Sequence, residues 1–268
     1  MSRLTADRLI AASRHRLRRM LDWRVVRWYR LGAYQQAWYL RRLFRDLKIN
    51  LVLDVGGNAG QFARFIRSQV GYAGPMITFE PIPDLAERLR SKARGDPTWT
   101  IVEVALGDST RSDSFNVMES SPLSSMLAPS GDESRRLSAQ NRVARRIPIQ
   151  VQTLDRFFED QPALAHYRNI YLKLDVQGYE RRVLEGATLA LERVAALQAE
   201  LSVVPLYHEV PDYKALMGYI ESLGYVLSFI PAHDYEQFPD MLDFDCHFVR
   251  REHLEALGLL KPARPHGG

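Results

Sequence analysis

The stretch LVLDVGGNAG at residues 51–60 constrains the fold more than any other part of the chain. An apolar run ends in Asp54, a glycine-rich turn follows, and Phe62, Phe65 and Ile66 then recur at helical spacing. A buried strand, a glycine turn and a helix in this order are typical of a cofactor site in an open α/β sheet, because glycine lets the backbone approach a ligand closely.

The glycine spacing excludes two common phosphate-binding motifs. Asn58 stands where the dinucleotide fingerprint needs its second glycine, and no Lys-Ser or Lys-Thr pair follows Gly60, as a P-loop requires. An acid at the end of the strand suits a cationic ligand instead, and S-adenosylmethionine (SAM) carries an ammonium and a sulfonium. Glu80 ends the next apolar run, where an acid accepts hydrogen bonds from both ribose hydroxyls. Asp54 and Glu80 together therefore predict a methyl-donor site.

Short apolar runs and helical patterns alternate along the chain, which predicts a parallel, doubly wound sheet of the Rossmann-like α/β class. The predicted strands lie near residues 51–55, 76–80, 100–105, 170–175, 196–201, 224–230 and 244–250. The predicted helices lie near residues 35–46, 60–69, 83–94, 153–159, 179–193 and 212–223. The loop between the last two strands is too short for a full helix, so we expect these strands to pair antiparallel.

Three predicted parts make up the chain: a basic helical segment at 1–48 that Gly32 breaks or bends, a single α/β domain at 49–250, and a tail at 251–268. Inside the domain, residues 107–150 form a long connection between the third and fourth strands. Residues 114–117 and 147–151 within it are candidate extra strands. A long connection at the ligand edge of a sheet is usually functional, such as a lid.

The positive charge is concentrated at the N-terminus. Residues 1–48 hold 13 Lys and Arg against 3 Asp and Glu, whereas the whole chain has a net charge of only +4. Two interpretations of Arg14–Arg30 stay open: an amphipathic surface for anionic lipid or a phosphorylated carrier, or a solvated arginine face on a docked helix. No recognised binding motif accompanies the charge, so we expect no nucleic-acid partner.

Cysteine content and hydropathy bear on the compartment. The single cysteine, Cys246, excludes an internal disulfide framework and favours a reducing environment. The chain has no apolar run of transmembrane length, and arginines interrupt its N-terminus where a signal peptide would be apolar. We therefore expect a cytoplasmic protein, peripheral at the membrane if the basic helices bind anionic lipid. The sequence leaves the oligomeric state open.

Six blocks, in order, resemble the FkbM family of SAM-dependent methyltransferases: LDVGGNAGQFA, FEPIP, VEVALGD, SSPLSSML, KLDVQGYERRVLEGA and QAELSVVPLY. The resemblance covers about residues 40–250 and leaves residues 1–35 outside. It implies a class I methyltransferase fold with seven strands, the last antiparallel. It also implies O-methylation of a hydroxyl on a sugar, glycolipid or polysaccharide, or on a polyketide-type natural product. A module that binds the cofactor without catalysis is the alternative from another class.

The resemblance assigns roles to residues around the donor. Asp54, Gly56, Asn58 and Gly60 would surround the methionine part, and Glu80 would hold the ribose. Pro81, Ile82, Ala105 and Leu106 would flank the adenine. Asp108 would reach the adenine amino group or cap the next turn.

Candidate catalytic groups follow the later strands, where ligands bind in open sheets. A sugar hydroxyl is a weak acid, so methyl transfer to it needs a general base, a metal, or both. Lys173 and Asp175 end one predicted strand on the same side, Glu200 ends the next, and His208 follows in a loop. Asp175 and Glu200 could jointly bind Mg²⁺, which takes oxygen ligands. Alternatively Asp175 is the base or an orienting group, with His208 as the base.

Overall fold

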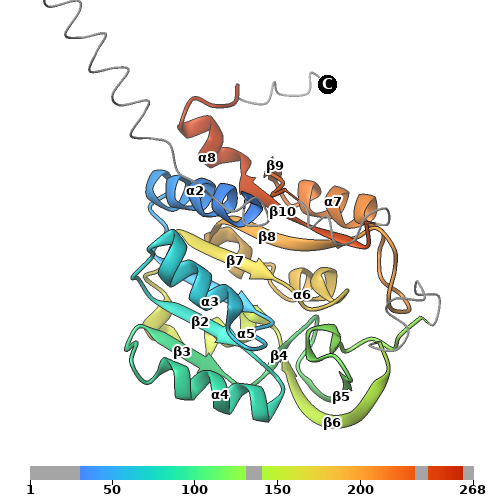
Figure 1. Cartoon of the computed structure of the whole chain (residues 1–268). Helices are drawn as coiled ribbons and strands as arrows, with labels where there is room; N and C mark the ends of the chain where they lie inside the picture. Colours follow the sequence, from blue (N-terminus) through green and yellow to red (C-terminus); the bar gives the residue numbers. More distant parts are fainter. Residues whose placement is uncertain (1–30, 131–140, 233–240, 262–268) are drawn as a thin grey trace, which may run out of the picture.

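The structure is a computed structural model that describes residues 31–130, 141–232 and 241–261. A seven-stranded sheet forms its centre, with the strand order β3-β2-β1-β7-β8-β10-β9 (Figure 1). Its strands are β1 (Leu51–Val55), β2 (Met76–Phe79), β3 (Trp99–Val102), β7 (Ile170–Leu174), β8 (Val194–Ser202), β9 (Tyr225–Phe229) and β10 (Asp243–Arg250). The helices around it are α2 (Leu31–Asp46), α3 (Gln61–Phe65), α4 (Pro83–Ala93), α5 (Leu154–Glu159), α6 (Glu180–Glu185), α7 (Tyr213–Ser222) and α8 (Arg251–Ala256).

The pairing of the strands is the one expected for a class I methyltransferase. Strands β3, β2, β1, β7 and β8 pair in parallel, whereas β10 runs antiparallel between β8 and β9. The predicted doubly wound sheet with an antiparallel last strand is thus confirmed. Because β10 lies next to β8, its residue Asp245 pairs with Glu200 of β8 at the site described below.

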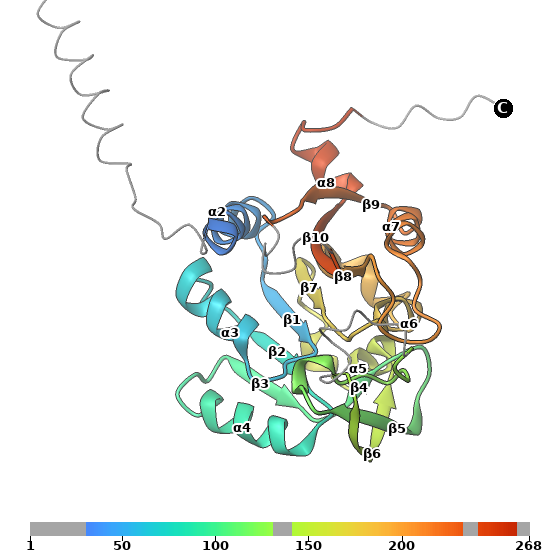
Figure 2. The same cartoon turned by 45° about the vertical axis from the view of Figure 1, so that its right-hand side comes forward.

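Both faces of the sheet are buried, which explains why its central strands are apolar at successive positions. One core contains Leu51, Leu53 and Leu172 and packs against α5, α6 and α7. The other contains Val52 and Tyr171 and packs against α2 and α3. Strand periodicity sends neighbouring residues to opposite faces, so a five-residue apolar strand serves both cores. Figure 2 shows helices on either side of the sheet.

Two predicted elements differ from the structure. The predicted helix 179–193 ends at Glu185, and a separate 3-10 turn, Ala190–Arg193, follows. Gly186 lies so close to Gly107 that an added Cβ would be 2.0 Å from the Gly107 oxygen, and the Asp155 carboxylate accepts the Leu189 and Ala190 N–H groups. These contacts stop the helix, so the single-helix prediction was wrong.

The predicted strand 100–105 is also two strands. β3 ends at Val102, and β4 (Ala105–Leu106) joins a second, three-stranded sheet with β5 (Arg111–Met118) and β6 (Val143–Gln152). The two extra strands expected between residues 107 and 150 are confirmed as parts of β5 and β6, which pair antiparallel. This small sheet lies beside the carboxyl ends of the central strands (Figure 1).

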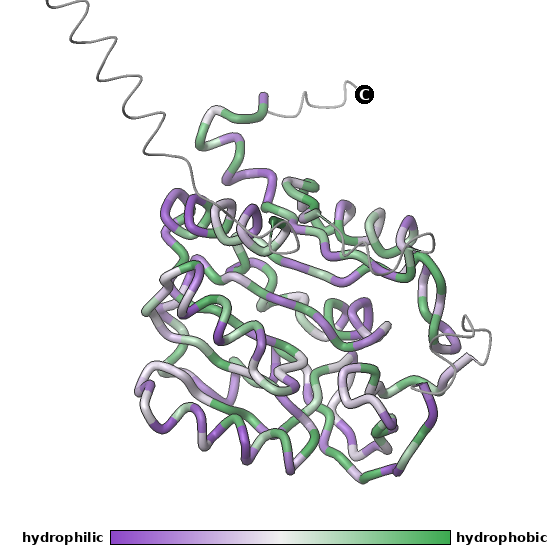
Figure 3. Tube along the Cα trace, in the orientation of Figure 1, coloured by the Kyte–Doolittle hydropathy of each residue, from purple (hydrophilic) through white to green (hydrophobic). Residues whose placement is uncertain are grey.

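Residues 1–30 lie outside the described residues, so the structure does not distinguish between the two interpretations of Arg14–Arg30. Gly32, predicted to break the N-terminal helical run, lies in the first turn of α2. None of the helices in the described ranges has the length and hydropathy needed to span a bilayer. Hydrophilic and hydrophobic residues alternate along α4 in Figure 3, as expected for a helix with one face on the sheet.

Candidate functional site

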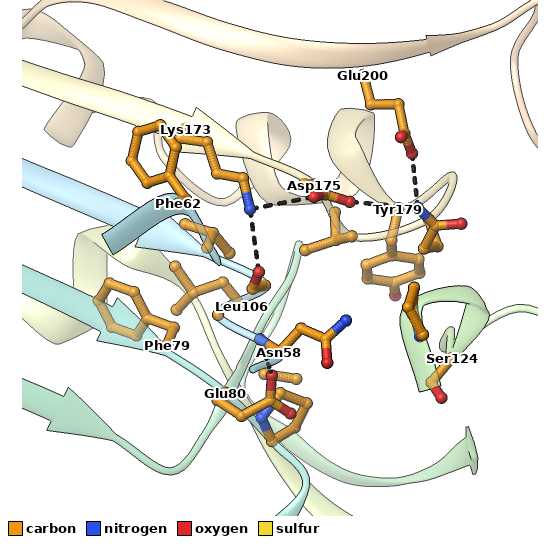
Figure 4. A pocket seen from close by; sticks show the side chains of 18 of the residues that line it. Asn58, Phe62, Phe79, Glu80, Leu106, Ser124, Lys173, Asp175, Tyr179 and Glu200 are labelled. Carbon is orange, nitrogen blue, oxygen red and sulfur yellow. Dashed lines mark hydrogen bonds and ion pairs between the residues drawn. The ribbon is translucent and has the colours of Figure 1, made fainter. Parts of the chain in front are cut away.

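A cavity of about 420 Å³ opens at the carboxyl ends of β1, β2, β7 and β8. Its wall on one side is the glycine turn after β1 and the segment after β2. On the other side lie the ends of β7, β8 and β10, and Ser121, Pro122 and Ser124 from the inserted sheet cover it. Figure 4 shows side chains from the glycine turn, from the segment after β2, from the ends of β7 and β8 and from the insertion around one space. In open α/β sheets this edge is where ligands bind.

The glycine turn has a geometry that only glycine satisfies at its first position. Gly56 has φ +85°, and an added Cβ would lie 1.9 Å from the Asp175 carbonyl oxygen. The N–H groups of Gly56 and Gly57 both donate to the Phe79 carbonyl at 3.1 Å. The turn is therefore held between the ends of β2 and β7, and it presents Asn58 to the cavity.

Glu80 is tied to this turn. Its carboxylate accepts the Asn58 N–H at 2.7 Å and the Ile82 N–H at 2.9 Å while lining the cavity (Figure 4). Burial raises the pKa of Glu80 to about 7, although the two N–H donors oppose this shift. The remaining lone pairs of the carboxylate are available to a ligand with paired hydroxyls.

The same half of the cavity is apolar beyond Glu80. Pro81, Ala105 and Leu106, expected at the adenine, all line it, as does Ile82. Two further apolar residues there, Leu85 and Phe115, were not predicted. Leu85 lies two residues beyond FEPIP, in the first turn of α4, and Phe115 lies in an insertion whose strand pairing the sequence did not reveal.

Lys173 lies at the centre of the site and joins its two sides. Its Nζ is 3.3 Å from Asp54 Oδ1 and 3.2 Å from Asp175 Oδ2, and it donates to the Gly56 carbonyl at 3.0 Å. Burial disfavours the ammonium, but the Asp175 and Asp54 carboxylates outweigh it and raise the pKa of Lys173 above its usual value. Lys173 therefore forms ion pairs with Asp54 and with Asp175.

Asp54 is completely buried and is not among the residues that line the cavity. It sits directly beside Lys173 in the β1–β7 register and beside Thr78 in the β1–β2 register, and the Thr78 hydroxyl donates to it at 3.1 Å. Burial raises the pKa of Asp54, against the opposing effect of Lys173. The acid at the strand end thus faces a lysine of the protein itself, and the donor contact expected for it stays a prediction.

Asp175 and Glu200 are brought together by a residue that the sequence did not single out. Gln177 Nε2 donates to Asp175 Oδ1 at 3.2 Å and to Glu200 Oε2 at 2.7 Å (Figure 4). Gln177 has φ +53°, and the Tyr207 hydroxyl contacts its Oε1 at 3.1 Å. Burial, followed by the charge of Asp175, raises the pKa of Glu200 well above its usual value.

Gln36, Gln198 and Asp245 also line this half of the cavity and were missed as site residues. Gln198 pairs with Lys173 across β7–β8, and Asp245 pairs with Glu200 across β8–β10. Asp243, Asp245 and His247 alternate along β10, and in the sequence this pattern is compatible with a metal site or with a polar strand edge. The buried His247 instead contacts the Tyr171 hydroxyl at 2.9 Å and Gln36 Nε2 at 3.1 Å, and burial lowers its pKa to about 3.

The expected magnesium site is not supported. Within the described ranges, no group of three or more His, Cys, Asp or Glu side chains is arranged to hold a metal. The Gln177 amide, which donates N–H groups, stands between the two carboxylates proposed as ligands. A donor at this position repels a cation, so the pair is held by a hydrogen-bonded bridge.

Besides Asp54, three expected site residues do not reach the cavity. His208 is exposed and does not line it. The Asp108 carboxylate, expected at the adenine, is held by Arg111 at 2.8 Å and Arg182 at 3.1 Å. Gly60 begins α3 with φ +79°, and its missing side chain leaves room for Leu89 and Trp99. The structure therefore gives Asp108 and Gly60 roles in packing and leaves the His208 side chain at the surface.

Comparison with known proteins identifies the family. The model of the FkbM methyltransferase domain matches residues 54–227. The chain belongs to this family. It is a SAM-dependent methyltransferase of the class I fold, as the resemblance implied. None of the curated proteins compared matches it in sequence.

Several solved methyltransferase structures are similar in overall arrangement. Fibrillarin from Aeropyrum pernix, solved with bound SAM, shares 13% identity over 82% of this chain and 76% of its own, with a TM-score of 0.44. An O-methyltransferase from Bacillus cereus, solved with SAH, shares 10% identity over 80% of each chain, with a TM-score of 0.44. Magnesium protoporphyrin IX methyltransferase from Synechocystis PCC 6803 shares 11% identity over 92% of this chain and 95% of its own, with a TM-score of 0.42.

The chemistry of the cavity fits this donor. Its lining holds four carboxyl groups and one ammonium, a surplus of acid that suits a ligand with a sulfonium and an ammonium. Burial raises the pKa values of Glu80 and Glu200, and a cation bound beside either carboxyl group would favour its ionised form. The apolar half next to Glu80 suits a planar base attached to a ribose.

Proposed function

We propose that this methyltransferase acts on a hydroxyl group of a sugar, a glycolipid or a polysaccharide. The observation that carries the proposal is the polar lining opposite the donor half: Asp175, Gln177, Gln198, Glu200 and Asp245. Carboxylates and side-chain amides form hydrogen bonds with adjacent hydroxyls, of which a sugar offers several. A mainly apolar acceptor would gain little from this lining and would leave its polar groups unpaired.

The donor would occupy the other half. In this proposal Glu80 holds the ribose hydroxyls, while Ile82, Ala105 and Leu106 contact the adenine. Asn58 and the backbone of the glycine turn border the methionine part. When bound, SAM would supply the methyl group: the acceptor oxygen would attack the methyl carbon in line with the breaking carbon–sulfur bond, and S-adenosylhomocysteine would leave.

Asp175 is the proposed general base. Its side chain is 40% exposed, whereas Lys173 is almost wholly buried, so Asp175 is the member of the ion pair that an acceptor can reach. Lys173 Nζ fixes one carboxylate oxygen and Gln177 Nε2 the other. Asp175 would take the hydroxyl proton, and the partly buried Glu200 would orient the acceptor through a hydrogen bond. Positioning of the two reactants then supplies much of the acceleration.

A transfer assay with isotopically labelled SAM tests the proposal. The panel contains free sugars, oligosaccharides, glycolipids and polyketide-type hydroxyl compounds. We expect a labelled methyl ether on a sugar hydroxyl, lost in Asp175→Asn and kept in the surface control Asp160→Asn. Transfer only to polyketide-type compounds would reject the sugar acceptor. Donor binding without transfer to any acceptor would favour the non-catalytic module.

A further inference from the structure

Exposed apolar side chains gather on one edge of the molecule. Among the described residues, seven large hydrophobic side chains are exposed. Five of them belong to α2, to the segment after β9 and to α8 with the residues that follow it: Leu31, Trp38, Ile230, Leu257 and Leu259. Both ribbon views place α2, β9 and α8 along the same edge (Figures 1 and 2). We call these five residues, with Arg42 and Arg45, the edge face.

Contacts beneath the edge face show that the elements carrying it are packed together. A Cβ on Gly32 would lie 2.6 Å from the Ala232 oxygen, so the start of α2 touches the segment after β9. Tyr39 of α2 stacks on Phe229 of β9 with ring centroids 4.5 Å apart. Leu254 of α8 packs on the core that contains Leu40 of α2. Patches of apolar side chains of this kind mark interaction sites.

The exposed face of helix α2 carries both apolar and basic side chains. Leu40, Phe44 and the other buried residues face the sheet, whereas Leu31, Trp38, Arg42 and Arg45 are exposed. Their spacings of seven, four and three residues place these four on one stripe. Its first half is apolar and its second half basic, as the purple end of α2 in Figure 3 shows. Helices that lie in a membrane interface combine Trp and Leu with Arg in this way.

The positive charge around the edge face indicates which kind of partner it binds. Arg41, Arg42, Arg45 and Lys48 lie in or just after α2 and are exposed. Residues 1–30, which lead directly into α2, add nine arginines and only two acids to the sequence. A second copy of this chain would bring arginines against arginines, whereas an anionic surface complements them.

We propose that the edge face binds an anionic lipid bilayer, with Leu31 and Trp38 among the acyl chains and Arg42 and Arg45 at the headgroups. Helix α2 also contributes Gln36 to the wall of the cavity. A bilayer docked on α2 therefore lies next to the acceptor half of the site. If the enzyme methylates sugars, as proposed above, its acceptor is then a sugar anchored to a lipid.

Sedimentation of the full chain with vesicles tests the docking. We expect binding to phosphatidylcholine vesicles that contain phosphatidylglycerol and none to pure phosphatidylcholine. Trp38→Ser and the double variant Arg42→Glu/Arg45→Glu should each weaken binding at least about tenfold. The matched controls are Leu189→Ser, an exposed leucine outside the edge face, and Arg88→Glu/Arg94→Glu at α4. These controls should bind vesicles as the unchanged chain does.

Two results would overturn the proposal. One is vesicle binding that the α2 variants leave unchanged. The other is a dimer in light scattering that Trp38→Ser dissociates, which would assign the edge face to a second copy. Thermal melting of each variant establishes that it folds, and titration with SAM should give an unchanged Kd. Vesicle binding without transfer to any sugar would reject the proposed function while the docking stands.

Discussion

The two halves of the cavity are built in different ways. The donor half comes from short continuous segments: the turn after β1, residues 79–82 after β2, and Ala105 and Leu106. The acceptor half is assembled from single side chains on separate elements, including Gln36 on α2 and Asp245 on β10. Both of these lie outside the residues that the family model matches.

This contrast suggests how one fold serves different acceptors. The donor half depends on backbone geometry, such as the positive φ of Gly56 and the hydrogen bonds that Glu80 accepts from two backbone N–H groups. A substitution at one of these positions disturbs the whole turn. The acceptor half depends on which side chains meet at one sheet edge, and these can change one at a time. Four experiments test whether the halves are separable.

Asp175→Asn should have the largest effect. Removing the proposed base should lower kcat about a thousandfold, within the range of general-base catalysis. The SAM Kd from calorimetry should stay within about threefold, because Asp175 acts on the acceptor. A Kd that rises as steeply as kcat falls would break the division between the halves.

Glu80→Ala is the counterpart in the donor half. The two backbone N–H groups that Glu80 accepts would lose a charged partner, and so would the ribose. We expect the SAM Kd to rise about a hundredfold, corresponding to two charge-assisted hydrogen bonds. The exposed Glu103, which pairs with Arg90, supplies the control Glu103→Ala. An unchanged Kd in Glu80→Ala would move the donor elsewhere.

Donor affinity should depend on pH through the same residue. Burial raises the pKa of Glu80 to about 7, so a substantial fraction of Glu80 is protonated in the free protein near neutrality. A cationic donor favours the ionised carboxylate, so binding releases protons and strengthens as pH rises from 6 to 8. Each released proton contributes up to about tenfold in Kd per pH unit. Calorimetry in two buffers of different ionisation enthalpy measures the release, and proton uptake would contradict it.

Gln36→Ala should have the smallest effect and the most selective one. Losing one neutral hydrogen-bonding group should raise the acceptor KM about fivefold, with kcat and the SAM Kd unchanged. Gln35→Ala, at the exposed neighbouring position, is the matched control. A change in donor affinity would place Gln36 in the donor half.

The sequence predicted those parts of the site that are encoded in local segments of the chain. The glycine turn, Glu80, Pro81, Ala105 and Leu106 were predicted from contiguous blocks and line the cavity. Lys173, Asp175 and Glu200 were predicted from strand ends and also line it. Strand ends can be recognised locally, because alternation and a terminal acid need no knowledge of neighbouring strands.

Partners across strands could not be predicted in this way. Asp54 meets Lys173, Lys173 pairs with Gln198, and Asp245 pairs with Glu200 only because of the register between strands far apart in the chain. The early end of the predicted helix 179–193 also depends on a distant segment, because Gly186 packs directly against Gly107. His208 is a predicted site residue that does not line the cavity. It lies in a loop, where the sequence has no periodicity from which the orientation of a side chain can be predicted.

By itself the sequence determined the donor fold: an apolar strand, a glycine turn and an acid one strand further on, each specified by local propensity and periodicity. Only the tertiary structure decided which carboxylates face the cavity, which one is buried against Lys173, and that Gln177 bridges two of them. The physical reason is that a side chain's direction is set by its own strand, whereas its partner is set by the packing of the whole sheet.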